Sequence, residues 1–212
     1  MTLGENEIAP LVAFNNEIDE SQHSLLSMTY KPTMEKMLFL ILGNSINRFF
    51  EEEIHNILND VAERNLCARL AIYFTDQIRE HKLAGYYADP EYNRKQGGQV
   101  KTILDDRLNI ITIQSDLIIH SRGAYVENDN LIAIEMKKAN RSVEEKNADR
   151  DRLRAMTKDS YDEIWSADGM THPEHVCGYI LGVYLILDIR SRTCIIEYYR
   201  KGAFFNQESI QF

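Results

Sequence analysis

The sequence predicts an α/β protein in which helices pack against a mixed β-sheet. In residues 32–83, apolar side chains recur at three- and four-residue steps, which is the spacing of amphipathic helices. Residues 108–120, 131–138 and 176–187 are short apolar runs rich in Ile, Val and Leu, as expected for strands. A charged stretch of helical character separates the second run from the third, so helices and strands alternate along the chain.

The first part of the chain is predicted to be helical. Residues 32–60 form one helical region, in which Gly43, Asn44 and Ser45 suggest a break, with Asn44 or Ser45 capping the next helix. A second helix is expected over residues 61–83, where one apolar stripe contains Leu66, Leu70, Phe74 and Ile78. We therefore divide the chain into a helical N-terminal extension, residues 1–60, and a core, residues 61–212.

The strands are expected mainly in the second half. A short strand is predicted at residues 86–88, and the runs 108–120 and 131–138 flank a turn-rich connection that favours an antiparallel hairpin. Residues 142–161 are predicted to form an exposed helix whose charges alternate in sign. The run 176–187 suits a strand buried on both faces, and residues 193–199 suit a final strand.

Composition favours a globular protein outside the membrane. The chain has 212 residues, of which 44% are hydrophobic and 27% charged, and no apolar run is long enough to span a bilayer. The N-terminal residues do not resemble a signal peptide. Cys67, Cys177 and Cys194 match neither a disulfide framework nor a zinc pattern. A reducing cytoplasm is the location that these features predict.

The net charge of −9 argues against unaided, tight binding to nucleic acid. The charge is unevenly distributed, however. Residues 91–154 contain 12 Lys and Arg against 11 Asp and Glu, whereas the remaining residues contain 12 against 22. The middle of the chain is therefore nearly neutral, and bound cations would screen those of its acids that belong to a metal site.

Two charged residues interrupt the apolar run 131–138. Because strand side chains alternate between faces, Ile132, Ile134 and Met136 are predicted to point one way and Glu135 and Lys137 the other. Charged groups in an apolar strand are costly unless they are paired or bind a metal. A candidate second carboxylate is Asp116, which opens the neighbouring apolar run and which hairpin pairing would bring beside Glu135.

This combination suits phosphodiester hydrolysis. Two carboxylates hold Mg²⁺ through oxygen ligands, with water filling the other positions. A metal so held polarises the phosphate and lowers the pKa of an attacking water. Lys137 would then act either as the base or as an electrostatic partner of the phosphate.

With these residues the sequence resembles the PD-(D/E)XK nuclease superfamily, which has the restriction-endonuclease-like fold. Ser115-Asp116 stands where the family has Pro-Asp, and Glu135-Met136-Lys137 matches (D/E)-x-K. The resemblance implies that Asp116, Glu135 and Lys137 are catalytic and that Asp116 and Glu135 bind the metal. It also implies a third metal ligand on the preceding helix, for which Glu63 is the candidate, although a solvated helix face explains Glu63 equally well.

A narrower likeness, to small stand-alone bacterial members, covers residues 63–199. It rests on Glu91-Tyr92-Asn93-Arg94, on residues 116–123 and on residues 130–138. The candidate substrate-binding residues are Arg64, Arg94 and Lys138. For His120 a structural role is the preferred interpretation.

The resulting prediction is a cytoplasmic hydrolase that cuts DNA with Mg²⁺, for which Mn²⁺ substitutes. The alternative is a catalytically inactive binding subunit of a bacterial defence or DNA-processing complex, and a third hypothesis has RNA as the substrate. DNA is the expected partner, with a homodimer or larger complex formed through the N-terminal helices and no membrane association.

Overall fold

The computed structural model describes residues 33–92, 102–104, 110–112, 115–125, 128–159 and 178–212. Within these residues the chain forms an α/β fold with a six-stranded mixed sheet of order β1-β4-β5-β6-β7-β8, and β2 and β3 form a separate hairpin. The elements are α1 (Met34–Leu58), α2 (Glu63–Glu80), β1 (Tyr87–Pro90), β2 (Thr102–Leu104), β3 (Ile110–Thr112), β4 (Leu117–His120), β5 (Asn130–Lys138), α3 (Val143–Met156), β6 (Leu181–Asp188), β7 (Thr193–Arg200) and β8 (Ala203–Gln211).

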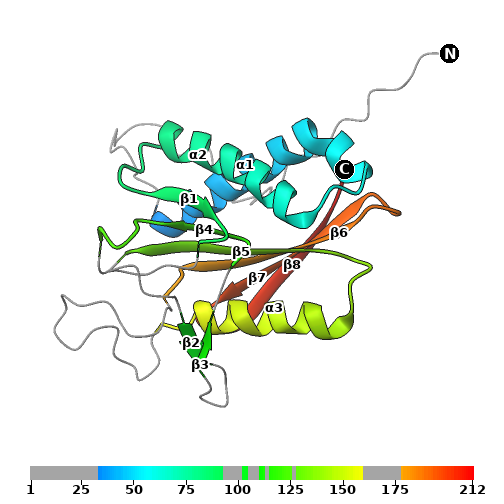
Figure 1. The fold of residues 1–212 in the computed structure, drawn as a ribbon. Coiled ribbons are helices and arrows are strands. Elements are labelled where there is room, and N and C mark those ends of the chain that lie inside the picture. Colours follow the sequence, from blue (N-terminus) through cyan, green and yellow to red (C-terminus); the bar gives the residue numbers. More distant parts are fainter. Residues whose placement is uncertain (1–32, 93–101, 105–109, 113–114, 126–127, 160–177) are drawn as a thin grey trace, which may run out of the picture.

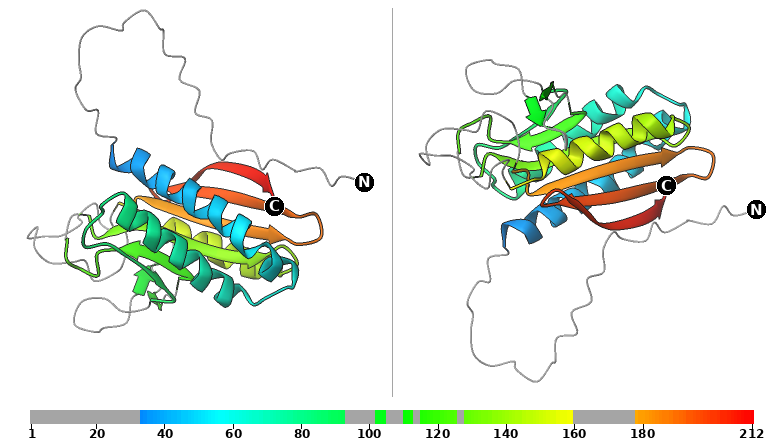
Figure 2. Two further views of the ribbon diagram at one scale, coloured as in Figure 1. Left: turned by 90° about the horizontal axis from the view of Figure 1, so that it is seen from above. Right: turned by 90° about the horizontal axis from the view of Figure 1, so that it is seen from below.

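The elements form three layers. Helices α1 and α2 cover one face of the sheet and α3 covers the other (Figure 1). Seen from the side of α1 and α2, α1 crosses the strands of the C-terminal half and α2 lies over β1, β4 and β5 (Figure 2). The predicted α/β arrangement with helices on a mixed sheet is therefore confirmed at this level.

Helix α1 is continuous, so the predicted break at Gly43, Asn44 and Ser45 is wrong. Gly43 and Ser45 are buried inside the helix, between the core residues Leu42 and Ile46. Packing of this apolar stripe outweighs the weak helix propensity of the glycine, which costs only about 1 kcal/mol relative to alanine.

Helix α1 shares one hydrophobic cluster with α2 and with strands β4 to β7. Its Phe50 stacks on Phe212, next to the end of β8, with ring centroids 4.9 Å apart. The division of the chain into an extension and a core at residue 60 stays a prediction. The described residues 33–60 pack against the sheet as part of this hydrophobic cluster.

Some of the predicted strands agree with the structure and others do not. The hairpin of β4 and β5 is antiparallel, as predicted, and β6 is buried along almost its whole length. The single strand predicted over residues 108–120 is wrong, because β3 and β4 belong to different sheets. Strand β8 was not predicted: its side chains are mostly exposed, so backbone pairing with β7, rather than an apolar pattern, holds it in the sheet.

Strands β5 and β6 run parallel, with Glu135 paired to Tyr184 and Lys137 to Ile186. A parallel pair requires a crossover connection, which α3 provides. Within the described part of the chain, no helix is long and apolar enough to cross a membrane.

Candidate active site

The hairpin of β4 and β5 brings Asp116 and Glu135 together. Leu117 pairs with Ile134, so Asp116, directly before β4, lies opposite Glu135. The Asp116 carboxylate accepts a hydrogen bond from the backbone N–H of Met136 at 2.8 Å, which fixes it against β5. The sequence prediction that places these two carboxylates side by side is confirmed.

Alternation along β5 separates two faces, also as predicted. Ile132, Ile134 and Met136 join the cluster beneath α1 and α2, whereas Ala133 belongs to the cluster beneath α3. Glu135 and Lys137 share the face of Ala133 and meet side chains of α3.

Glu135 is fully buried, and neither of its carboxylate oxygens receives a hydrogen bond in the described structure. Arg152 Nη1 lies 2.8 Å from Glu135 Oε2, an ion-pair distance without the alignment of a hydrogen bond. A buried carboxylate without donors is costly, so this position is unfavourable unless another group compensates the charge.

Helix α3 adds a third carboxylate, Asp149, which sequence reasoning missed together with Arg152. Asp149 is buried and accepts hydrogen bonds from Tyr184 Oη and from Arg152 Nη1, both at 3.2 Å. The Lys137 ammonium lies 3.4 Å from Asp149 Oδ2. The site therefore holds the carboxylates of Asp116, Glu135 and Asp149 and the cations of Lys137 and Arg152.

A signal for Asp149 is present in the sequence. Asp149, Leu153 and Met156 follow one another at steps of four and three, so they share one helical stripe. All three are buried against the sheet, which corrects the prediction of an exposed helix. Arg152, one helical turn after Asp149, lies on the same side of the helix.

The electrostatics of the cluster reflect burial and crowding. Burial, and next the neighbouring Asp116 carboxylate, raise the pKa of Glu135 well above its usual range. Burial also raises the pKa of Asp116. Burial lowers the pKa of Lys137, but the carboxylates around it, led by Asp149, outweigh that effect and raise the pKa overall. The net effect of the cluster favours the protonated form of Lys137.

Glu63 begins α2 and lies near the end of β5. Its Oε1 accepts a hydrogen bond from the backbone N–H of Lys138 at 2.9 Å, and its carboxylate pairs with Arg141 at 3.1 Å. It also raises the pKa of Lys137 through its charge, after the effects of burial, Asp149 and Asp116. Glu63 thus borders the cluster, but its carboxylate is engaged by other donors.

Of the candidate substrate-binding residues, Lys138 and Arg64 make separate contacts in the described structure. Lys138 points to the α1 and α2 side, where its ammonium donates to the Asp60 backbone carbonyl at 2.9 Å and to its carboxylate at 2.6 Å. Arg64 is an exposed residue that pairs with Glu91. Arg94 lies outside the described residues.

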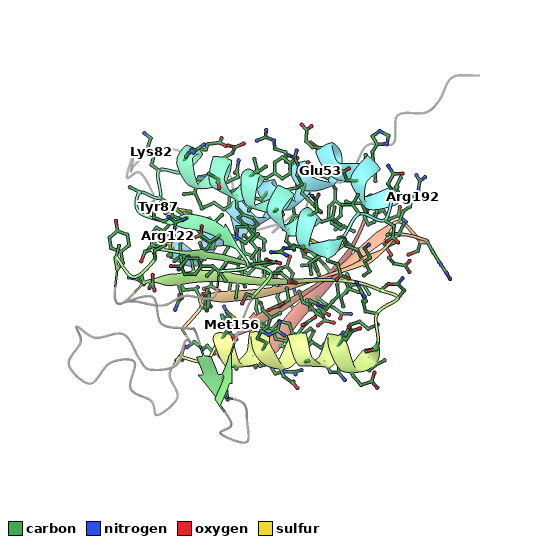
Figure 3. The ribbon with its side chains drawn as sticks, viewed as in Figure 1. Glu53, Lys82, Tyr87, Arg122, Met156 and Arg192 are labelled. Carbon is green, nitrogen blue, oxygen red and sulfur yellow. The ribbon has the colours of Figure 1, made fainter. Side chains whose placement is uncertain are left out.

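His120 has a structural environment, as preferred from the sequence. It is buried on β4, and its Nε2 lies 3.0 Å from Asp89 Oδ2. Arg122 donates two hydrogen bonds to the same carboxylate, from Nη2 at 2.6 Å and from Nε at 2.7 Å. Its guanidinium also lies over the Tyr87 ring (Figure 3). These contacts hold β1 to β4 at the edge of the sheet.

A divalent cation fits the donor set in part. Among the residues that the structure describes, no three His, Cys, Asp or Glu side chains are arranged to hold a metal ion. Mg²⁺, however, is commonly bound through one or two carboxylates and keeps several waters. Asp116 and the buried Glu135, whose oxygens lack hydrogen-bond donors, provide such a pair.

Comparisons with known proteins give no assignment: no family model, curated protein or solved structure matches this chain.

Proposed function

We propose that this protein is a metal-dependent nuclease with a restriction-endonuclease-like fold and that it hydrolyses phosphodiester bonds of DNA. The single observation that carries the proposal is Glu135, a fully buried carboxylate that receives no hydrogen bond from the described residues and lies beside Asp116 and, on the same strand face, beside Lys137. A buried carboxylate that receives no hydrogen bond is costly to the fold, which supports a functional rather than a purely structural role for this arrangement.

Asp116 and Glu135 would hold the cation, Mg²⁺ or Mn²⁺. When bound, such a cation supplies a Lewis acid and lowers the pKa of a coordinated water. The low dielectric around Glu135 strengthens its attraction for a cation, and the hydrogen bond from Met136 N–H keeps Asp116 in position.

Lys137 would serve as the electrostatic partner of the phosphate. Burial lowers the pKa of Lys137, but the surrounding carboxylates, led by Asp149, raise it overall, which supports the electrostatic role over that of a general base. Its side chain retains 20% exposure, which leaves it accessible from solvent while Asp149 orients it.

Cleavage of linear duplex DNA in Mg²⁺ or Mn²⁺ tests the proposal. Wild-type protein should cut, and Lys137→Ala should lower the rate at least about a hundredfold, the scale of losing one charge-stabilising group. Lys146→Ala is the matched control, because the Lys146 ammonium donates a hydrogen bond to the Ala139 carbonyl and not to the carboxylates of the site, and it should cut at the wild-type rate.

Equal cutting by Lys137→Ala and wild type would contradict this role for Lys137. Running the same assay on single-stranded DNA and RNA separates DNA from RNA as the substrate.

A second candidate function is a nuclease-fold subunit that binds a partner without cutting. The ion pair of Arg152 with Glu135 supports it, because an arginine already compensates the carboxylate. Absence of saturable Mg²⁺ or Mn²⁺ binding would favour this second function.

A further inference from the structure

Arg152 contacts two carboxylates through one nitrogen atom. Its Nη1 lies 2.8 Å from Glu135 Oε2 and 3.2 Å from Asp149 Oδ1. Asp149 also accepts a hydrogen bond from Tyr184 Oη, which fixes the position of its carboxylate on α3. About a quarter of the Arg152 side chain is exposed, so the guanidinium sits between the buried cluster and solvent.

The two contacts differ in kind. Arg152 donates a hydrogen bond to Asp149, whereas its approach to Glu135 lacks that alignment, and within the described part of the chain neither Glu135 oxygen accepts a hydrogen bond. The guanidinium therefore supplies charge to Glu135 but little directional bonding. Such a contact is easier to replace than a bidentate pair.

We propose that the Arg152 guanidinium is a built-in counter-cation of Glu135, which a divalent cation must displace, so that Arg152 sets the cation affinity of the site. This inference rests on the proposed function. A divalent cation on Glu135 and Asp116 would lie close to the guanidinium, and like charges at such a distance repel strongly in a buried site. Asp149 gives the displaced guanidinium a partner without any movement of α3.

Glu135 needs a counter-cation because the fold buries its carboxylate completely. Without one, Glu135 would be a buried, uncompensated charge, and such a group strongly destabilises a protein. Arg152 keeps the site folded when no metal is bound, at the expense of weaker metal binding.

Calorimetric titration with Mn²⁺ tests this inference without using activity. Arg152→Gln removes the competing charge and should bind Mn²⁺ at least about tenfold more tightly than wild type. Arg154→Gln is the matched control: it removes the same charge from the same helix, but its partner is Asp151 on the surface. Its Mn²⁺ affinity should stay within about threefold of wild type.

Thermal unfolding of Arg152→Gln with and without Mn²⁺ provides the second measurement. The variant should unfold at a lower temperature than wild type without metal, and Mn²⁺ should raise its unfolding temperature more than that of wild type. A variant that folds only in Mn²⁺ supports the inference. A variant that stays unfolded in saturating Mn²⁺ contradicts it, because the cation then cannot take the place of the guanidinium.

The outcomes distinguish this inference from the proposed function. If wild type binds Mn²⁺ and Arg152→Gln binds it no more tightly, only the inference fails. If neither protein binds Mn²⁺, the proposed function fails with it. If only Arg152→Gln binds Mn²⁺, the inference holds, and the Arg152 guanidinium keeps Mn²⁺ out of the wild-type site.

Discussion

At the scale of single residues, the buried glutamates Glu53 and Glu135 are in opposite situations. Glu53 on α1 accepts hydrogen bonds from Asn56, Arg69 and Tyr73, at 2.5 to 2.7 Å. Burial raises the pKa of Glu53, but these three donors outweigh it and lower the pKa overall. At Glu135, burial and the Asp116 carboxylate raise the pKa overall and outweigh the neighbouring Arg152 guanidinium, which lowers the pKa. Glu53, visible on α1 in Figure 3, is thus satisfied by the fold, whereas Glu135 is not.

Asp89 provides a residue-scale prediction of pH dependence. Burial raises the pKa of Asp89, but the hydrogen bonds and charges of Arg122 and His120 lower it overall. Because the native pKa is below the unfolded one, the stabilisation is fully present above the unfolded pKa of about 4 and is lost as pH falls towards the native pKa. Asp89→Asn should cost about 1–2 kcal/mol at pH 7, since water partly screens the half-exposed Arg122.

Urea unfolding at pH 7 and pH 3 measures this effect. The difference in the free energy of unfolding between wild type and Asp89→Asn should shrink at pH 3. A difference that is the same at both pH values would contradict the assignment of the lowered pKa to Asp89.

At the scale of elements, the position of α3 depends on a close approach to β6. A Cβ atom added at Gly182 would lie 2.9 Å from Thr157 Cγ2, just after α3, and 3.0 Å from Tyr199 Cβ on β7. Glycine at this position lets the C-terminal end of α3 come down onto the sheet. The N-terminal end is fixed by a capping box between Ser142 and Glu145.

Gly182→Ala should therefore destabilise the protein by about 1–3 kcal/mol, the usual cost of overpacking. Equilibrium unfolding in urea measures the change, with circular dichroism to establish that the variant retains its secondary structure. Stability within about 0.5 kcal/mol of wild type would show that α3 is not seated on β6 in this way.

The elements also show how far sequence reasoning reaches. The two-residue alternation of residues 131–138 correctly placed Glu135 and Lys137 on one face, because alternation is a property of any strand. It did not find Asp149 and Arg152, because charges of alternating sign are usual on a solvated helix and only tertiary packing buries them here. Strand β8 escaped prediction for a related reason, since pairing rather than burial stabilises it.

At the scale of the whole molecule, each face of the sheet has its own hydrophobic cluster, and the smaller one, on the α3 side, adjoins the charged residues around Glu135. Beneath α1 and α2 lies the larger hydrophobic cluster, and beneath α3 lie the acids and cations around Glu135. The chain as a whole is acidic, with a net charge of −9, so cations rather than anions are attracted over long distances. This favours recruitment of a divalent cation to the site.

The central claim is that Asp116 and Glu135 hold a divalent cation, and calorimetric titration of Mn²⁺ into wild type and Glu135→Gln tests it most directly. Glu135→Gln keeps the shape of the side chain and removes its charge, and Glu52→Gln, an exposed position on α1, is the matched control. We expect saturable binding to wild type and Glu52→Gln, and at least about tenfold weaker binding to Glu135→Gln. No saturable binding to wild type, or equal affinity in Glu135→Gln, would contradict the claim.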